Sequence, residues 1–107
     1  MSPIKYDRRK GLGRGLIVYY CSRRGVEFRV VTTGCRELNE VGSKFTLWVD
    51  VHVDEDIEAH LQSSKEISRF GTWDAPPIKL NMITKRKYVE DFMGYVCDEV
   101  ERFRAKS

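Results

Sequence analysis

The sequence predicts an α+β domain in which a mainly antiparallel sheet carries two helices packed on one face, in the order β-β-β-α-β-α. Three observations predict this fold. Apolar and polar residues alternate strictly over residues 44–53, as in an antiparallel strand with one covered and one solvated side. Apolar residues recur at helical spacing over residues 54–70 and 85–104. Two apolar runs flank a Ser-Arg-Arg-Gly turn at residues 22–25, which is typical of a β-hairpin.

The four strands are expected at residues 16–21, 26–33, 44–53 and 78–82. In the third strand the odd-numbered residues, Phe45 to Val53, should face the core, and Trp48 should lie on the opposite, solvated side. Arg29 and Val31 of the neighbouring strand should share the side of Trp48. A loop at residues 72–77 precedes the fourth strand, because its two prolines exclude a helix.

The first helix is expected to begin after Asp54, a good N-cap residue, and to end at Gly71. The second is expected from about Lys85 to Arg104. Each has a stripe of apolar residues that should face the sheet. The predicted stripes are Ile57, Leu61, Ile67 and Phe70 in the first helix, and Val89, Phe92, Val96, Val100 and Phe103 in the second.

A chain of 107 residues is the size of one domain. Residues 1–14 are rich in basic residues and glycine, and we expect a flexible basic arm there, followed by a single domain over residues 15–107. No apolar run reaches the length of a membrane span. The N-terminus leads into charged residues instead of an apolar leader, which favours a cytoplasmic location.

The three cysteines are widely separated and form no Cys-x-x-Cys pair, so neither a disulfide scaffold nor a zinc knuckle is expected. Cys21 and Cys97 fall within apolar stretches and are interpreted as core residues. Cys35 lies in an expected loop and is the one cysteine that could be reactive.

Charge is distributed unevenly along the chain. Residues 1–53 carry ten Lys and Arg against five Asp and Glu, whereas residues 54–107 carry nine against eleven. This polarity favours attraction of an anionic partner to the N-terminal half. It does not distinguish nucleic acid from an acidic protein.

An enzyme is not expected. The order of elements is similar to that of the ribonuclease H-like fold, whose enzymes hold divalent metal ions with carboxylates on the first strand, the first helix and the fourth strand. Residues 16–21 and 78–82 contain no acid, so that chemistry is not available. Asp50, His52 and Asp54 share one side of a strand, but their spacing suits a single metal ion poorly. Neither a cofactor nor a metal site is predicted.

The candidate binding residues are basic groups and one outward-facing aromatic residue: Arg8, Arg9, Lys10, Arg14, Arg23, Arg24, Arg29, Trp48, Lys85, Arg86 and Lys87. For each group a structural alternative stays open. The arm could be a solubilising tail, Trp48 could be covered by the arm or by the 72–77 loop, and the basic run at residues 85–87 could precede a helix that begins nearer Tyr88.

These observations predict a small non-enzymatic binding or regulatory protein that engages nucleic acid through its basic arm and an exposed sheet face. Its size and character suggest a phage or mobile-element accessory protein. The alternative is a protein-binding inhibitor or adaptor acting on a host protein complex, with Trp48 and the acidic sides of both helices at the interface. A homodimer formed through an unpaired edge strand also remains open.

Overall fold

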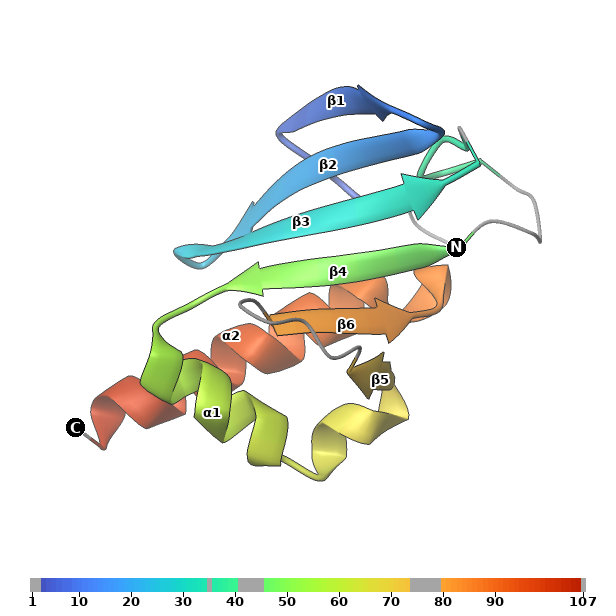
Figure 1. Ribbon diagram of the computed structural model, residues 1–107. Helices are drawn as coiled ribbons and strands as arrows, with labels where there is room; N and C mark the ends of the chain where they lie inside the picture. Colours follow the sequence, from blue (N-terminus) through green and yellow to red (C-terminus); the bar gives the residue numbers. More distant parts are fainter. Residues whose placement is uncertain (1–2, 35, 41–45, 74–79, 107) are drawn as a thin grey trace.

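A six-stranded antiparallel sheet with strand order β1-β2-β3-β4-β6-β5 forms the frame of the molecule (Figure 1). The computed structural model describes residues 3–34, 36–40, 46–73 and 80–106. In chain order the elements are β1 (Arg8–Gly13), β2 (Leu16–Arg23), β3 (Val26–Thr33), β4 (Leu47–His52), α1 (Glu55–Ser63), the 3-10 turn η1 (Glu66–Arg69), β5 (Gly71–Trp73), β6 (Leu80–Thr84), the 3-10 turn η2 (Arg86–Tyr88) and α2 (Val89–Ala105).

The α+β class, the antiparallel sheet and the two helices agree with the prediction. Both helices contribute to one hydrophobic core against the inner face of the sheet, and α2 crosses behind β4 and β6 in Figure 1. The predicted helical stripes face this core: Ile57, Leu61, Ile67, Phe70, Val89, Phe92, Val96 and Val100 are buried, and Phe103 packs against the core at its margin.

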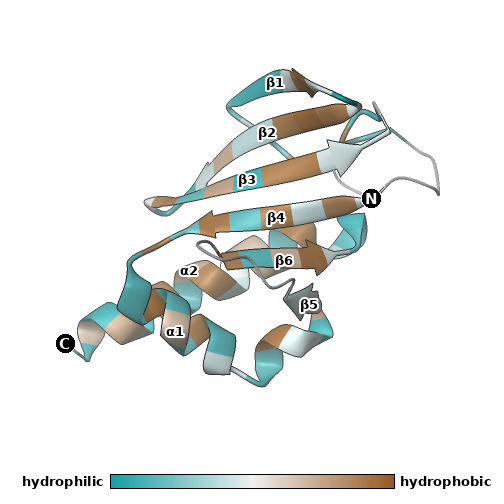
Figure 2. Ribbon diagram, in the orientation of Figure 1, coloured by the Kyte–Doolittle hydropathy of each residue, from teal (hydrophilic) through white to brown (hydrophobic). Residues whose placement is uncertain are grey.

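The alternation predicted for the third strand is confirmed over the described part of that strand. Leu47, Val49 and Val51 are buried in the core, whereas Trp48 and its outward-facing neighbours are half-buried. Figure 2 shows the same alternation as bands of hydrophobic and hydrophilic residues along β4. Phe45 lies outside the described residues. The strand pattern was informative because one side of β4 is covered by the helices and the other is not.

The prediction of a flexible arm over residues 1–14 is wrong for most of its length. Residues Arg8–Gly13 form β1, which pairs with β2 at the edge of the sheet. Gly13, Arg14 and Gly15 all have positive φ, between 54° and 76°, and turn the chain back into β2. Glycines that suggested mobility instead allow a tight turn.

The segment before β1 is also anchored, at Ile4. The side chain of Ile4 is 4% exposed. Its backbone N–H donates to Asn39 Oδ1 at 2.9 Å, and Asn39 Nδ2 donates to the carbonyl of Ile4 at 3.1 Å. This two-bond clamp could not be read from the sequence, because its partners are 35 residues apart.

The boundaries of the helices differ from those predicted. α1 ends at Ser63 because Ser64 adopts an extended conformation, and η1 follows as a separate turn. Gly71 does not end a helix but begins β5. A Cβ atom at Gly71 would lie 1.6 Å from the carbonyl oxygen of Ile83, so the close approach of β5 and β6 requires glycine there.

The second helix begins later than Lys85. The α-helical hydrogen bonds start at Val89, and Arg86–Tyr88 form the 3-10 turn η2. The alternative of a start near Tyr88 is therefore correct, and the basic run precedes the helix, so it does not occupy the first α-helical turn. In the described residues, neither helix is long and apolar enough to span a membrane.

Candidate functional site

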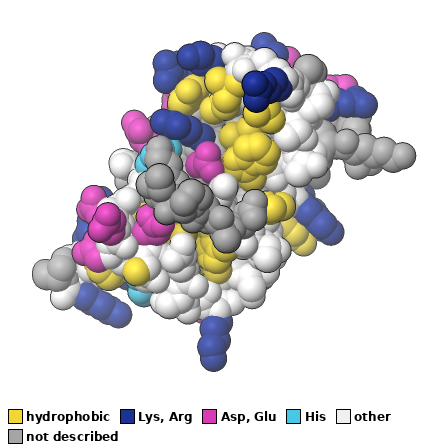
Figure 3. Space-filling view, in the orientation of Figure 1, with side chains coloured by type: hydrophobic (Ala, Val, Ile, Leu, Met, Phe, Trp, Pro, Cys, Tyr) yellow, Lys and Arg dark blue, Asp and Glu magenta, His cyan; other side chains and the backbone are white. Residues whose placement is uncertain are grey.

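The side of the sheet that faces away from the helices carries apolar, basic and acidic side chains, and we call it the open face (Figure 3). The strand register defines it as two rows of side chains that run across the strands. One row contains Val18, Val31, Trp48 and Ile83, and the next contains Tyr20, Arg29, Asp50 and Asn81. Arg8 and Lys10 of β1 extend these rows, opposite Tyr20 and Val18.

The first row is an apolar strip. Val18 and Val31 are each 4% exposed, yet neither belongs to the core cluster on the helix side. Trp48 is half-buried and Ile83 is 39% exposed. Trp48 is therefore neither fully exposed nor fully covered. The strip presents part of its indole ring and the side chain of Ile83 to solvent.

The second row brings two cations to one aromatic ring. The guanidinium of Arg8 lies 4.0 Å from the centre of the Tyr20 ring, and that of Arg29 lies 5.7 Å from it. Within the described part of the chain, neither arginine forms an ion pair with a carboxylate. Cation–π contacts hold both groups over the ring while leaving their N–H donors available.

A hollow of about 240 Å³ lies at this cluster, lined by Asp7, Arg8, Tyr20, Cys21, Ser22, Glu27, Phe28 and Arg29. The carboxylate of Asp7 accepts a hydrogen bond from the backbone N–H of Ser22 at 3.0 Å and so is held at one wall. The hollow therefore combines the guanidinium groups of Arg8 and Arg29 and the ring of Tyr20 with the carboxylates of Asp7 and Glu27. Such a combination suits an anionic group attached to a polar ring.

The two arginines at the tip of the β2–β3 hairpin, unlike Arg8 and Arg29, form ion pairs with acids of α2. Arg23 Nη2 lies 2.8 Å from Glu90 Oε1. Arg24 Nη1 lies 2.8 Å from Asp98 Oδ1, and Arg24 Nη2 lies 2.6 Å from Glu101 Oε2. Hydrogen bonds to Glu90 and to Glu101 raise the pKa of Arg23 and of Arg24, respectively. The tip of the β2–β3 hairpin is thus fastened to α2.

Two further predicted residues also serve the fold. Arg9 points to the other side of β1 from Arg8 and forms an ion pair with Glu37. Arg86 donates from Nε to the carbonyl of Leu38 at 2.9 Å and from Nη2 to Asn39 Oδ1 at 2.6 Å. Both tie the segment at residues 37–39 to the sheet and to η2.

The open face thus collects Arg8, Lys10, Arg29 and Trp48 from the predicted set. Arg14 is exposed at the turn between β1 and β2. Lys85 and Lys87 are exposed. Lys85 directly follows β6, two residues after Ile83, and the Lys87 ammonium lies 4.8 Å from the centre of the Tyr88 ring.

Sequence reasoning missed Tyr20 and Ile83. Residues 16–21 are almost entirely apolar, so the pattern did not indicate which of Tyr19 and Tyr20 faces outward. Tyr19 is fully buried and donates a hydrogen bond to Glu37 Oε2 at 2.7 Å, whereas Tyr20 is half-buried on the open face. Tyr20 pairs with Arg29 across the hairpin, which indicates that Tyr20 faces outward. This indication can be used only when the register of the hairpin is known.

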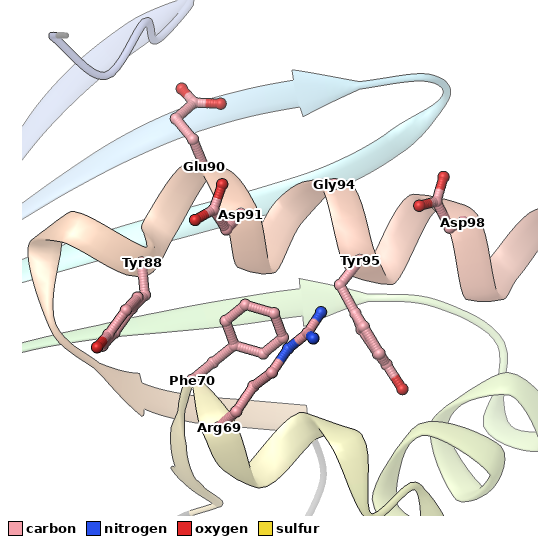
Figure 4. Close-up of a pocket in the computed structure, with 8 residues that line it drawn as sticks. All are labelled: Arg69, Phe70, Tyr88, Glu90, Asp91, Gly94, Tyr95 and Asp98. Carbon is pink, nitrogen blue, oxygen red and sulfur yellow. The ribbon is translucent and has the colours of Figure 1, made fainter.

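A second, larger hollow of about 650 Å³ lies on the other side of the molecule, between η1 and α2 (Figure 4). Its lining residues are Arg69, Phe70, Tyr88, Glu90, Asp91, Gly94, Tyr95 and Asp98. The Arg69 guanidinium lies 4.6 Å from the centre of the Phe70 ring and 5.7 Å from that of Tyr95. A Cβ atom at Gly94 would have no neighbour within 4 Å.

The Asp50, His52 and Asp54 series spans the end of β4 and the start of α1. Asp54 stands at the N-cap position of α1, but its side chain makes no capping hydrogen bond. Among the described residues, no group of three or more His, Cys, Asp or Glu side chains is placed to hold a metal ion.

The thiols of Cys21 and Cys97 are 2% and 1% exposed, as expected of core residues. Burial raises the pKa of Cys21 to about 11 and also raises that of Cys97. Cys35, the predicted reactive cysteine, lies outside the described residues. Burial and the raised pKa both disfavour the thiolate, which is the nucleophilic form, at these two residues.

Comparison of the chain with protein-family models, with curated proteins and with solved structures found no match.

Proposed function

We propose that this protein is a binding module that engages nucleic acid through the open face of its sheet. The observation that carries the proposal is the convergence of Arg8 and Arg29 on Tyr20, one row away from Trp48. Guanidinium groups without carboxylate partners among the described residues attract phosphate, and a neighbouring aromatic ring can stack on a base. Both requirements meet on one surface.

The acids at the starts of the two helices limit where a nucleic acid could bind. The first turn of α1 carries Glu55, Asp56 and Glu58, and the first turn of α2 carries Glu90 and Asp91. Glu55 and Glu58 line a hollow beside His52, at the end of β4. Because these acids repel phosphate, a nucleic acid would be directed to the part of the open face near β1, where Arg8 and Lys10 lie, and to the β1–β2 turn with Arg14.

The test is a fluorescence-anisotropy titration with a labelled oligonucleotide at two salt concentrations. A double variant, Arg8→Gln with Arg29→Gln, should bind more weakly and with a shallower dependence on salt, because fewer phosphates are neutralised. Lys65→Gln, which removes an exposed cation at η1 on the helix side, is the matched control and should bind like the unmodified chain. Equal losses in both variants would point to nonspecific charge and contradict the proposal.

A second candidate function is a protein-binding inhibitor or adaptor, and the hollow between η1 and α2 favours it. Its walls combine the rings of Phe70, Tyr88 and Tyr95 with carboxylates along α2. Asp91 has no ion-pair or hydrogen-bond partner in the described ranges of the chain. Aromatic residues beside a charged group are typical of protein interfaces.

The two candidates make different predictions for variants. If a protein partner binds at this hollow, its capture should be weakened by Asp91→Asn or by Gly94→Leu, which would fill the hollow. Its capture should be unchanged by the substitutions at Arg8 and Arg29. The reverse pattern, together with salt-dependent oligonucleotide binding, would support the open face.

A further inference from the structure

We infer that the ligand of the open face is a single strand and not a duplex. The inference rests on the proposed nucleic-acid function and specifies its substrate class. It follows from two features of the open face: the small number of cations left unbonded there, and the aromatic and apolar side chains beside them.

The first feature is the number of available cations. The sequence offers a long series of arginines near the sheet, but the fold uses most of them internally: Arg9, Arg23, Arg24, Arg36 and Arg86 are bonded to acceptors of this chain. Among the described residues, Arg8, Lys10 and Arg29 remain on the open face, with Arg14 at one edge and Lys85 directly after β6. A protein that holds duplex DNA largely by charge makes about six to ten phosphate contacts. The described part of the open face has fewer cations than that mode uses.

The second feature is the apolar strip. The bases of a duplex are stacked on one another, so a flat surface that meets the duplex from outside gains nothing from an indole ring. A single strand exposes its bases, and stacking one base on an aromatic side chain strengthens binding by about five- to a hundredfold. Trp48 and Ile83 are the partly exposed members of this strip. Their position beside the cations is useful for a single strand.

The positions of these residues also indicate which part of a single strand each of them would contact. Residues two apart on one side of a strand are separated by about 7 Å, which is the spacing between Arg29 and Val31 on β3. Val31 pairs with Trp48, so the cation row and the indole row are neighbours. A phosphate held by Arg8 and Arg29 would leave its base to reach Trp48, and the hollow beside Tyr20 would receive the neighbouring ribose or base.

The experiment compares a labelled single-stranded oligonucleotide with a duplex of the same length and strand sequence, using the unmodified protein. We expect the single strand to bind about tenfold more tightly or better. Its affinity should fall with salt with a logarithmic slope of about −0.7 for each phosphate neutralised, hence about −2 for Arg8, Lys10 and Arg29 together. A duplex bound equally or more tightly would overturn the inference while leaving the proposed function intact, whereas binding to neither would overturn both.

The stacking contact has its own variant. Trp48→Leu keeps an apolar side chain beside Val31 but removes the indole, and it should weaken single-strand binding about tenfold without changing the salt slope. Its thermal midpoint, measured alongside, separates loss of stacking from loss of folding. An unchanged affinity in a folded Trp48→Leu protein would remove Trp48 from the site and contradict the stacking argument. The single-strand and duplex comparison does not depend on this variant.

Discussion

The guanidinium of Arg8 lies 4.0 Å from the centre of the Tyr20 ring, across the pairing of β1 with β2. Unlike the arginines of the hairpin tip, Arg8 is positioned by a ring and not by a carboxylate. Its charge is therefore not neutralised within the described residues, although its side chain is held in place. An edge strand that was expected to be a mobile arm thus contributes a fixed cation to the open face.

Replacement of Arg24 by Gln should leave oligonucleotide affinity unchanged. Arg24 is bonded to Asp98 and Glu101 of α2, so it is engaged within the chain in spite of its place at an exposed hairpin tip. Solvent-exposed ion pairs contribute little to stability, and we expect only a small change in the thermal midpoint. A clear drop in affinity, measured by anisotropy against the unmodified protein, would show that phosphate displaces the acids of α2.

Gly94→Ala should stabilise the protein by about 1 kcal/mol, because glycine is that much less favourable than alanine inside a helix. Gly94 lies in the middle of α2, and a Cβ atom there would meet nothing within 4 Å. Thermal or urea unfolding measures the change. A lower midpoint would indicate that the wall of the hollow cannot accept even one methyl group, contrary to the structure.

Gly71→Ala should have the opposite effect. The added Cβ would lie 1.6 Å from the carbonyl oxygen of Ile83, which belongs to the backbone and cannot rotate away. We expect the pairing of β5 with β6 to be disrupted and the urea midpoint to fall well below that of Gly94→Ala. Equal stability of the two alanine variants would show that the close approach of the strands is not maintained in solution.

The thiols of Cys21 and Cys97 should react slowly with a thiol reagent until the protein unfolds. In a Cys35→Ser background these are the remaining cysteines, and burial raises the pKa of Cys21 from 9.0 to about 11. The folded protein keeps the thiol proton of Cys21 to a higher pH than the unfolded chain does. The contribution of the protonated thiol to the free energy of unfolding is therefore complete below about pH 9 and is lost as the pH rises through about 11. Stoichiometric labelling of the native variant near neutral pH would contradict this burial.

The parts of the fold that the sequence predicted are those specified by local periodicity. The alternation around Val49 indicated a strand with one covered side, and the stripe through Phe92 and Val96 indicated a core-facing helix. β1 was missed because its six residues are all exposed and therefore carry no burial pattern. Its pairing with β2 depends on the turn at Arg14. The glycines on both sides of Arg14 led to the prediction of a flexible segment.

The candidate site was only partly predictable for a related reason. Arg29 and Trp48 follow from the alternation of two strands, and their shared side was expected. Arg23 and Arg24 resemble free surface cations in the sequence, because their acidic partners on α2 lie 67 to 77 residues away. Long-range ion pairs and the clamp of Ile4 by Asn39 depend on the assembled fold, which no local pattern encodes.

The most direct test of the central claim is a two-dimensional amide NMR titration of the full chain with a short single-stranded oligonucleotide. We expect shifts on the open face, at the amides of Tyr20 and Arg29 and at the indole N–H of Trp48, with α2 undisturbed. Shifts confined to α2 around Asp91 and Gly94, or no shifts at a concentration of oligonucleotide that saturates in anisotropy, would contradict it.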